Sequence, residues 1–451
     1  MKKIIVLDDD PTGSQTVYGC SLIIKWDLNT ILTALRDSSP LFFILINTRA
    51  MNENDAKEVI IEVCNLIKLA LKIEELSFND VYVISRGDST LRGHFFIEPL
   101  IINDTIGPFD ALFYIPAFIE AGRLTIEGIH CLNGLPLHET SYAKDNIFGF
   151  KDSNLVNFLV EKSNSQITKE RVKRISKQLL EKASKSRSDF KLLQEMIIQF
   201  SNFQYVVVDI ENYIHMNTFC SLVKSLENKK RFLFRSAASL INGLSRLNKN
   251  KLDLLELNKF RVLDIFNQPK PGIIIIGSHV EIANKQLIAI LEEEQCQGIE
   301  LSVEEIYENI NSENGLHKMK AYREYITNKI FSIFECGKTP ILYTSRKEKR
   351  FNSTDQKIIF CNNLAIEIAL IIRGIYQDLG YIISKGGITT NILLRDGLLL
   401  NQVHLQGQIV PGLSLVYPDV NNSLKNLPIV TFPGNFGQTE TLKEIWQMFE
   451  A

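Results

Sequence analysis

The sequence predicts an α/β protein of two domains, each containing a mostly parallel β-sheet with helices around it. Three observations predict this fold. Short apolar runs alternate with helical stretches along the chain, and most runs end directly in polar residues or a turn. These runs lack polar alternation, which is typical of parallel strands because helices cover both of their faces. The chain has 451 residues, more than one ordinary core accommodates, so two domains are expected.

The first expected strand covers residues 4–7 and stops at three consecutive aspartates, Asp8, Asp9 and Asp10. Ligands of open α/β sheets bind at the carboxyl ends of the strands. Adjacent carboxylates repel one another unless a cation, a basic ligand or a proton relieves them. A ligand site is therefore the favoured interpretation of this turn. The alternative is a solvated turn whose acidic residues cap the following segment.

The remaining strands of a doubly wound N-terminal sheet also end in polar residues or turns, as a sheet with a binding edge requires. They are expected at 41–46, 81–84, 111–115, 205–208 and 232–234. Asn52 is a suitable N-cap for a helix whose apolar positions keep a helical period as far as residue 71. The basic stretch 151–191 has a helical period and few aromatic residues among its charges, so we expect a solvated helix face there.

The second half repeats the strand–turn–helix pattern after a linker expected at 267–271, where two prolines interrupt the periodic segments. This linker divides the chain into domains 1–266 and 272–451. Strands are expected at 272–276, 341–344, 381–384 and 429–432. Three of them lead into turns of small residues, at 277–278, 386–387 and 434–437. Glycine lets backbone N–H groups approach an anion closely, so these turns are candidate phosphate sites, although no Walker P-loop or GxGxxG motif is present.

Composition and charge exclude several functional classes. The formal net charge of −2 provides no global field for nucleic acid or an anionic membrane, so neither is an expected partner. The apolar run after the first lysines is too short for a secretory signal, and no later run is expected to span a membrane. The seven cysteines are scattered without a CxxC pair, which favours reduced thiols and a cytoplasmic location.

Ordered sequence blocks over nearly the whole chain resemble the four-carbon acid sugar kinases, ATP-dependent enzymes that act on threonate, erythronate and related tetronates. The N-terminal blocks are DDDPTGSQT (8–16), NTRA (47–50), RGDSTLRGH (86–94), AGRLTIEGIH (121–130), SYAKD (141–145) and RSAAS (235–239). The C-terminal blocks are GSHV (277–280), SKGGIT (384–389), GQIVPG (407–412) and FPGNFG (432–437). Pro11 and Ser14 stand where many members have a non-proline residue and an alanine, which indicates a distinct branch of the family.

The resemblance implies an N-terminal acid-sugar-binding domain, a C-terminal nucleotide-binding domain and a site in the cleft between them. The implied reaction is the phosphorylation of a hydroxyl of a threonate-, erythronate- or 3-oxo-tetronate-type acid, with ATP and Mg²⁺. The sequence leaves the metal ligands unassigned and a homo-oligomer open.

The candidate site residues follow from the strand ends and from these blocks. Asp10 and Asp88 are the expected catalytic residues, as acceptors of the hydroxyl proton, and Asp10 is alternatively a metal ligand. The expected substrate-binding residues are Asp9, Arg49, Arg86, Ser89, Thr90 and Arg92. Arginine binds a carboxylate through two parallel hydrogen bonds, but a structural ion pair with the nearby aspartates is the alternative for each arginine. The expected nucleotide-binding residues are Ser278, Lys385, Gly386, Gly387, Ile388, Thr389, Gly434, Asn435 and Gly437.

Two other functions compete with the kinase. Asp8-x-Asp10-x-Thr12 after a strand also resembles the opening motif of haloacid-dehalogenase-type phosphatases, in which Asp8 is a nucleophile and Asp10 an acid/base. The remaining roles in such an enzyme would be taken by Thr48, Lys385, Asp209 and Glu211. The third hypothesis is a non-catalytic protein that senses a sugar acid. His94 and His279 adjoin the candidate substrate and nucleotide blocks, but packed or surface histidines are the more common outcome.

Overall fold

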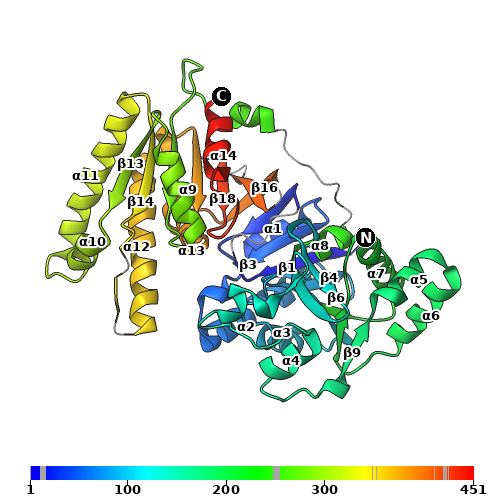
Figure 1. The fold of residues 1–451 in the computed structure, drawn as a ribbon. Coiled ribbons are helices and arrows are strands. Elements are labelled where there is room, and N and C mark those ends of the chain that lie inside the picture. The colour runs from blue at the N-terminus through cyan, green and yellow to red at the C-terminus, as the bar shows by residue number, and fades with distance from the viewer. Residues whose placement is uncertain are drawn as a thin grey trace. The chain divides into compact units, whose positions relative to one another are not determined.

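Two units make up the computed structural model, Met1–Lys249 and Asn250–Ala451, and each is an α/β fold (Figure 1). The structure describes residues 2–10, 17–245, 247, 254–347, 349–351, 353–410, 412–419, 424 and 426–451. Residues 11–16 of the opening block, including Pro11 and Ser14, lie outside the described residues.

The division between the units lies earlier in the chain than the expected linker at 267–271. The segment before that linker belongs with the second unit through its own contacts. Leu257 is fully buried in the core of the second unit, and Arg261 Nη1 lies 2.6 Å from Glu450 Oε2 on the C-terminal helix. The two prolines therefore follow the division instead of marking it.

The first unit contains a sheet whose strands are all parallel. Its strands, in spatial order, are β2 (Cys20–Ile23), β3 (Leu41–Leu45), β1 (Lys3–Asp8), β4 (Val81–Arg86), β11 (Phe232–Ser236), β5 (Ala111–Ile115), β10 (Gln204–Val208) and β9 (Val172–Ile175). The strands expected from the apolar runs are present. Their side chains are almost entirely buried, which explains why the runs show no polar alternation.

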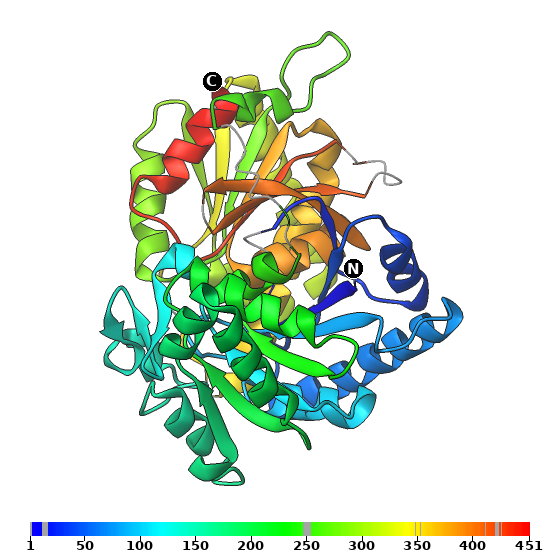
Figure 2. The same cartoon turned by 90° about the vertical axis from the view of Figure 1, so that its right-hand side faces the viewer.

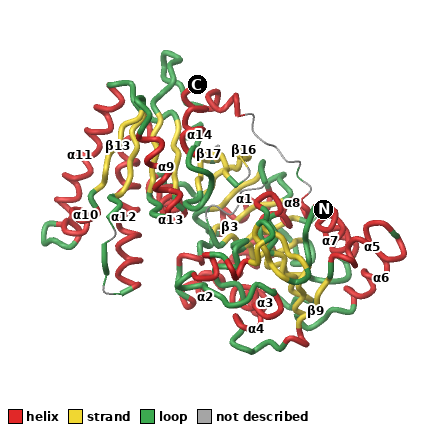
Figure 3. The backbone as a smooth tube through the Cα atoms, viewed as in Figure 1, coloured by secondary structure: helices red, strands yellow, loops and turns green. Residues whose placement is uncertain are grey.

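Helices cover both faces of this sheet (Figure 3). On one face, Ile5 and Leu7 of β1 share a core with α1 (Leu28–Arg36), α2 (Glu53–Ile73), α3 (Ile97–Ile106) and α4 (Leu155–Lys162). On the other, the ring of Phe219 on α7 (Tyr213–Ser225) packs edge-on against Phe113 of β5, with 5.0 Å between the ring centroids. Asn52 caps α2 as expected, because its side chain accepts hydrogen bonds from the N–H groups of Asn54 and Asp55.

The expected helical character of 151–191 is only partly correct. Residues Val172–Ile175 form β9, an edge strand that pairs with β10, and α5 (Lys177–Lys185) and α6 (Arg187–Ile198) follow it. Val172 and Ile175 fit one face of a helix by their spacing, but pairing with the neighbouring strand overrides that local pattern. A small antiparallel sheet of β6 (Arg123–Ile126), β7 (Ile129–Leu132) and β8 (Leu135–Pro136) was not expected from the sequence.

The second unit contains a mixed sheet, seen from a second direction in Figure 2. The order is β13 (Cys296–Leu301), β14 (Thr339–Thr344), β12 (Gly272–Ile276), β15 (Tyr381–Lys385), β18 (Ile429–Phe432), β17 (Leu413–Pro418) and β16 (Gln402–Val410). The first five run parallel to one another, β17 pairs antiparallel with β18, and β16 pairs antiparallel with β17. α9 (Glu281–Leu291) and α14 (Thr441–Glu450) bury apolar side chains against β12 and β15.

One helix of the second unit corrects the expectation that no run reaches membrane-spanning length. Gln356–Asp378, which includes most of α12 (Thr354–Ile375), is long and apolar enough to span a membrane, with a mean hydropathy of 1.8. Ala365 and Ala369 of this helix pack with Ile392 of α13 (Gly387–Ile392) in a small apolar cluster. The helix therefore takes part in the core of the unit, although parts of its surface are exposed.

Candidate functional site

The carboxyl ends of four strands bring the predicted substrate residues to one edge of the first sheet. Asp8 pairs in register with Leu45 of β3 on one side and with Arg86 of β4 on the other. Arg86 in turn pairs with Ser236 of β11. The loops that follow β1, β3, β4 and β11 therefore start at the same level, as the parallel arrangement predicts.

Asp9 and Asp10 share one guanidinium. Arg49 Nη2 donates a hydrogen bond of 2.6 Å to Asp9 Oδ1, and Arg49 Nη1 donates one of 3.1 Å to Asp10 Oδ2. The Asp9 side chain is fully buried, whereas the Asp10 side chain is 19% exposed. Burial of Arg49 opposes its charge, but Asp9, Asp10 and Asp88 outweigh burial and raise the pKa of Arg49. The structural ion pair considered for Arg49 is thus present in the chain.

Asp8 is buried beneath this pair. Its Oδ1 accepts a hydrogen bond of 3.3 Å from Arg86 Nη1, and its buried Oδ2 has no hydrogen-bond partner among the residues that the structure describes. Burial raises the pKa of Asp8 to about 7 against the opposing charge of Arg86. A fully buried carboxylate is poorly placed to act as the nucleophile of a phosphatase. The other residues of that hypothesis have partners of their own. Thr48 bonds Glu98, Asp209 bonds Arg174, and Lys385 bonds the Pro433 carbonyl oxygen.

A buried arginine, Arg235, lies next to Asp9, and the sequence did not indicate a role for it. Arg235 on β11 is fully buried, forms an ion pair with Glu98, and lies 3.7 Å from Asp9 Oδ2 through Nη2. Glu98 also accepts hydrogen bonds from Thr48 and Ser85, at 2.7 and 3.1 Å. Arg235 belongs to the RSAAS block, which was the available signal. Glu98, at the start of α3, carried no comparable signal.

The loop after β4 is held by its own aspartate. Asp88 accepts hydrogen bonds from the Thr90 hydroxyl, from Thr90 N at 3.1 Å and from Arg92 Nε at 2.7 Å. Burial would raise the pKa of Asp88, but Arg49, Arg92 and Arg123 outweigh it and hold that pKa well below its usual range. Gly93 closes the loop at φ +100°, and a Cβ there would lie 2.9 Å from Asp9 Oδ2. Both oxygens of Asp88 are therefore committed to the loop.

Ser89 joins this loop to the small antiparallel sheet. Arg123 Nη1 donates a hydrogen bond of 3.0 Å to Ser89 Oγ, and His130 Nε2 lies 2.8 Å from the Ser89 carbonyl oxygen. His130 is fully buried, and burial lowers its pKa to about 4. His94, by contrast, packs against Phe148 and contacts the Met51 carbonyl through Nε2 at 3.0 Å.

The three glycine turns of the second unit meet. A Cβ on Gly386 would lie 3.3 Å from Ser278 N, and one on Gly434 would overlap Ser278 Oγ. A Cβ on Gly277 would overlap Thr389 Oγ1. Gly386 also has φ +126°, which only glycine adopts readily. Ser278, Gly386, Thr389 and Gly434 thus form one constricted surface of backbone and hydroxyl groups, which suits close approach of an anion.

Lys385 differs from the expectation of a lysine that reaches a phosphate. It is fully buried, and its Nζ donates hydrogen bonds to the carbonyl oxygens of Pro433, at 3.0 Å, and Phe436, at 3.5 Å. Nζ also lies 3.9 Å from the Phe432 ring centroid. Burial lowers the pKa of Lys385 to about 7. The Lys385 amine therefore stabilises the 433–436 turn through these hydrogen bonds.

The remaining predicted nucleotide residues lie around these turns. Gly387 begins α13, and the side chain of the following Ile388 is 42% exposed. Asn435 is exposed, and Gly437 has φ +88° before α14. His279 Nε2 lies 2.8 Å from Thr344 Oγ1 at the end of β14.

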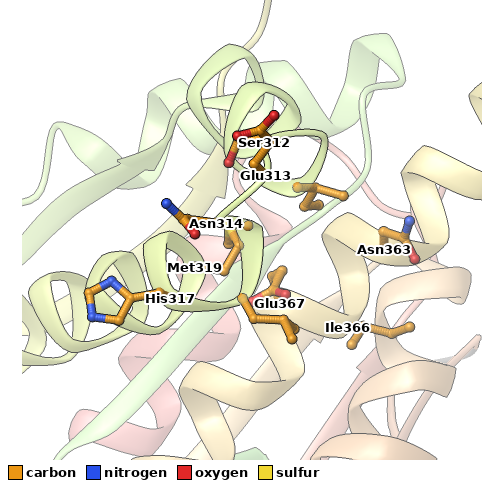
Figure 4. A pocket seen from close by; sticks show the side chains of 11 residues that line it. Ser312, Glu313, Asn314, His317, Met319, Asn363, Ile366 and Glu367 are labelled. Atoms are coloured by element: carbon orange, nitrogen blue, oxygen red, sulfur yellow. The ribbon is translucent and has the colours of Figure 1, made fainter.

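A cavity of about 500 Å³ in the second unit contains none of the predicted site residues. Ser312 to Asn314, between α10 (Val303–Ile310) and α11 (Gly315–Glu335), face Ile366 and Glu367 of α12 across it (Figure 4). It is formed by helices, whereas the glycine turns follow strands. We therefore assign it no part in the candidate site.

Comparison with known families agrees with this division of the chain. Residues 4–244 match the family model described as sugar-binding N-terminal domain. Residues 273–442 match the family model described as nucleotide-binding C-terminal domain. No curated protein matches the chain.

Solved structures share the fold over almost the full length. A Haemophilus influenzae protein assigned to DUF1537 has a TM-score of 0.64 at 17% identity, covering 99% of this chain and 100% of that chain. A Salmonella typhimurium LT2 protein that carries a provisional tRNA synthase name has a TM-score of 0.69 at 16% identity, covering 98% of both chains. At these identities the likeness shows the fold alone.

Proposed function

The chain belongs to the four-carbon acid sugar kinase family, and from this premise we propose that it transfers the terminal phosphoryl group of ATP to a hydroxyl of a four-carbon sugar acid. The acid is of the threonate, erythronate or 3-oxo-tetronate type. In this proposal the acid binds at the carboxyl edge of the first sheet, and ATP binds at the glycine turns of the second unit.

The observation that carries the proposal is the position of Asp10. Its carboxylate is partly exposed at the ligand edge and is oriented by Arg49, whereas Asp8 and Asp9 are buried. Phosphoryl transfer to an alcohol needs a carboxylate that accepts the hydroxyl proton or orients the hydroxyl. Asp88 is less suited to this role because both of its oxygens are engaged and its pKa is held low. We assign the chemical role to Asp10 and the shaping of the loop to Asp88.

The carboxylates near Asp10 suit a magnesium ion. Mg²⁺ is usually held by one or two carboxylates together with substrate phosphates. Asp10 is the partly exposed carboxylate of the three, so it would hold the ion. When bound, Mg²⁺ supplies neutralisation of the phosphate charge. Arg49 orients the Asp10 carboxylate in either role through its hydrogen bond of 3.1 Å.

The test is ADP release from ATP and Mg²⁺ in the presence of threonate, erythronate and related tetronates. The kinase proposal expects release that depends on one of these acids, with a phosphorylated acid as the product. Hydrolysis of sugar phosphates without ATP would instead support a phosphatase, and acid binding without any transfer would support a sensor. Either result would overturn the proposal. A cytoplasmic location and homo-oligomer formation belong to the proposal as well and are tested by fractionation and light scattering.

A further inference from the structure

Five arginines lie at the ligand edge of the first unit, and four of them are neutralised by carboxylates of the chain. Arg49 and Arg86 pair with the aspartates at the end of β1. Arg92 pairs with Asp88, and Arg235 pairs with Glu98. In the part of the chain that the structure describes, the Arg123 side chain has no carboxylate oxygen within 4.0 Å and donates a hydrogen bond only to the Ser89 hydroxyl.

The side chain of Arg123 is held in place while part of its hydrogen-bonding capacity is unused. Its backbone N–H and C=O both bond to Phe118, at 3.0 and 2.9 Å, directly after the end of β5. Its guanidinium carbon lies 5.9 Å from the Phe118 ring centroid, and its buried Nε has no hydrogen-bond partner within the described part of the chain. An arginine fixed in this way loses little conformational entropy when it binds an anion.

We propose that Arg123 binds the carboxylate of the sugar acid and makes the site specific for acids over uncharged sugars. This inference rests on the proposed function, whose sugar-acid substrate provides the carboxylate. The guanidinium offers a planar pair of donors that matches a carboxylate, and Ser89 offers a neighbouring hydroxyl. A substrate carboxylate at Arg49 or Arg86 would instead meet Asp8, Asp9 or Asp10 and be repelled.

The charge around Arg123 is consistent with an anionic ligand. The guanidinium is close enough to Asp88 and His130 to lower the pKa of both groups. Asp88 is already paired with Arg92 and Thr90, so it does not neutralise Arg123 directly. The positive charge of Arg123 therefore remains available to bind an anion beside Ser89 of the loop that follows β4.

The test measures binding of threonate and erythronate, and of their neutral amides, by calorimetry without nucleotide. We expect Arg123→Met to weaken binding of the preferred acid by about tenfold to a hundredfold, since a charge-assisted pair of hydrogen bonds is lost. Binding of the amide should change little, so the preference for acid over amide should disappear. Arg123→Lys keeps the charge without the planar fork and should restore part of the preference. ATP affinity should be unchanged in both variants.

The matched control is Arg187→Met, which removes an exposed arginine from α6 of the same unit and should bind the acid like the wild type. Thermal unfolding checks that the variants fold. If Arg123→Met does not fold, the acid preference of Arg123→Lys alone tests the proposal. The inference is overturned if Arg123→Met keeps the acid preference, if only ATP binding falls, or if the wild type binds neither acid. Arg123-dependent acid binding without phosphoryl transfer would support this inference while refuting the kinase reaction.

Discussion

The three consecutive aspartates at the end of β1 have different surroundings and therefore different chemical capacities. Asp8 is buried against Arg86, and Asp9 is buried between Arg49 and Arg235. Only Asp10 presents a partly exposed carboxylate. Removing a partner from a buried pair leaves an unpaired charge, so the arginines beneath Asp9 have a structural role beyond any ligand contact.

Asp10→Asn should lower kcat by about two to four orders of magnitude with little change in acid affinity, because the amide accepts no proton and binds metal weakly. Steady-state kinetics with ATP and the preferred tetronate measure this effect.

Asp88→Asn is the comparison, since it removes a charge that holds Thr90 and Arg92. It should reduce the free energy of unfolding by roughly 3–5 kcal/mol in urea titrations. Near-normal turnover in Asp10→Asn would transfer the chemical role to Asp88.

Lys385 should make stability depend on pH. Burial lowers the pKa of Lys385 to about 7 from its ordinary value of 10.5, which it regains in the unfolded chain. Between these values the unfolded chain binds a proton that the folded chain does not. The contribution of Lys385 to the free energy of unfolding therefore rises with pH from about 7 to 10.5, by at most roughly 5 kcal/mol, and is lowest below pH 7.

Urea titrations of the wild type and Lys385→Met at pH 6.5 and 9.5 measure this dependence. The wild type should gain stability relative to the variant at the higher pH. Other groups titrate equally in both proteins, so the difference between them isolates Lys385. An identical pH response in the two proteins would show that the buried ammonium has an ordinary pKa.

At the scale of elements, three strand-to-helix turns of the second unit depend on glycine for their close approach. Gly386→Val would place a branched side chain at φ +126° and against Ser278 N. We expect it to abolish ATP binding while tetronate binding to the first unit stays near the wild-type level. Calorimetry with each ligand measures both. Gly374→Ala is the control, because that helix glycine has open space around it. Normal ATP affinity in Gly386→Val would remove these turns from the nucleotide site.

At the scale of the whole molecule, the proposed reaction requires the acid of the first unit and the nucleotide of the second to meet. Closure that excludes water is a common way to achieve this in phosphoryl transfer. Small-angle scattering should therefore show a smaller radius of gyration only when acid and a non-hydrolysable ATP analogue are both present. Each ligand alone is the control. An unchanged radius at saturation with both ligands would contradict closure.

The sequence by itself determined the α/β class, the strands that form continuous apolar runs, and the positions of the polar residues at their ends. It could do so because buried parallel strands are continuous apolar runs and because turns need small or polar residues. The blocks around Asp8, Asp88 and Gly386 were also sufficient to indicate the family. The strands that were missed are β2, β9, β13, β16, β17 and those of the small sheet, β6 to β8. β9 forms by pairing with β10, which its local sequence does not show, and the strands of the small sheet are too short for a clear pattern.

Only the tertiary structure decided which charges meet. Arg49, Arg86 and Arg92 lie where the sequence suggested, but each is paired with an aspartate of the chain. The sequence does not distinguish the partners of Arg123 and Arg235. In the structure the Arg123 side chain bonds the Ser89 hydroxyl, whereas the buried Arg235 side chain forms an ion pair with Glu98. Pairing depends on the crossing of loops from different strands, which local sequence does not encode. The same reason explains why the sequence did not predict the partners of Lys385. They are carbonyl oxygens of the 433–436 turn, which reach Lys385 only in the folded chain.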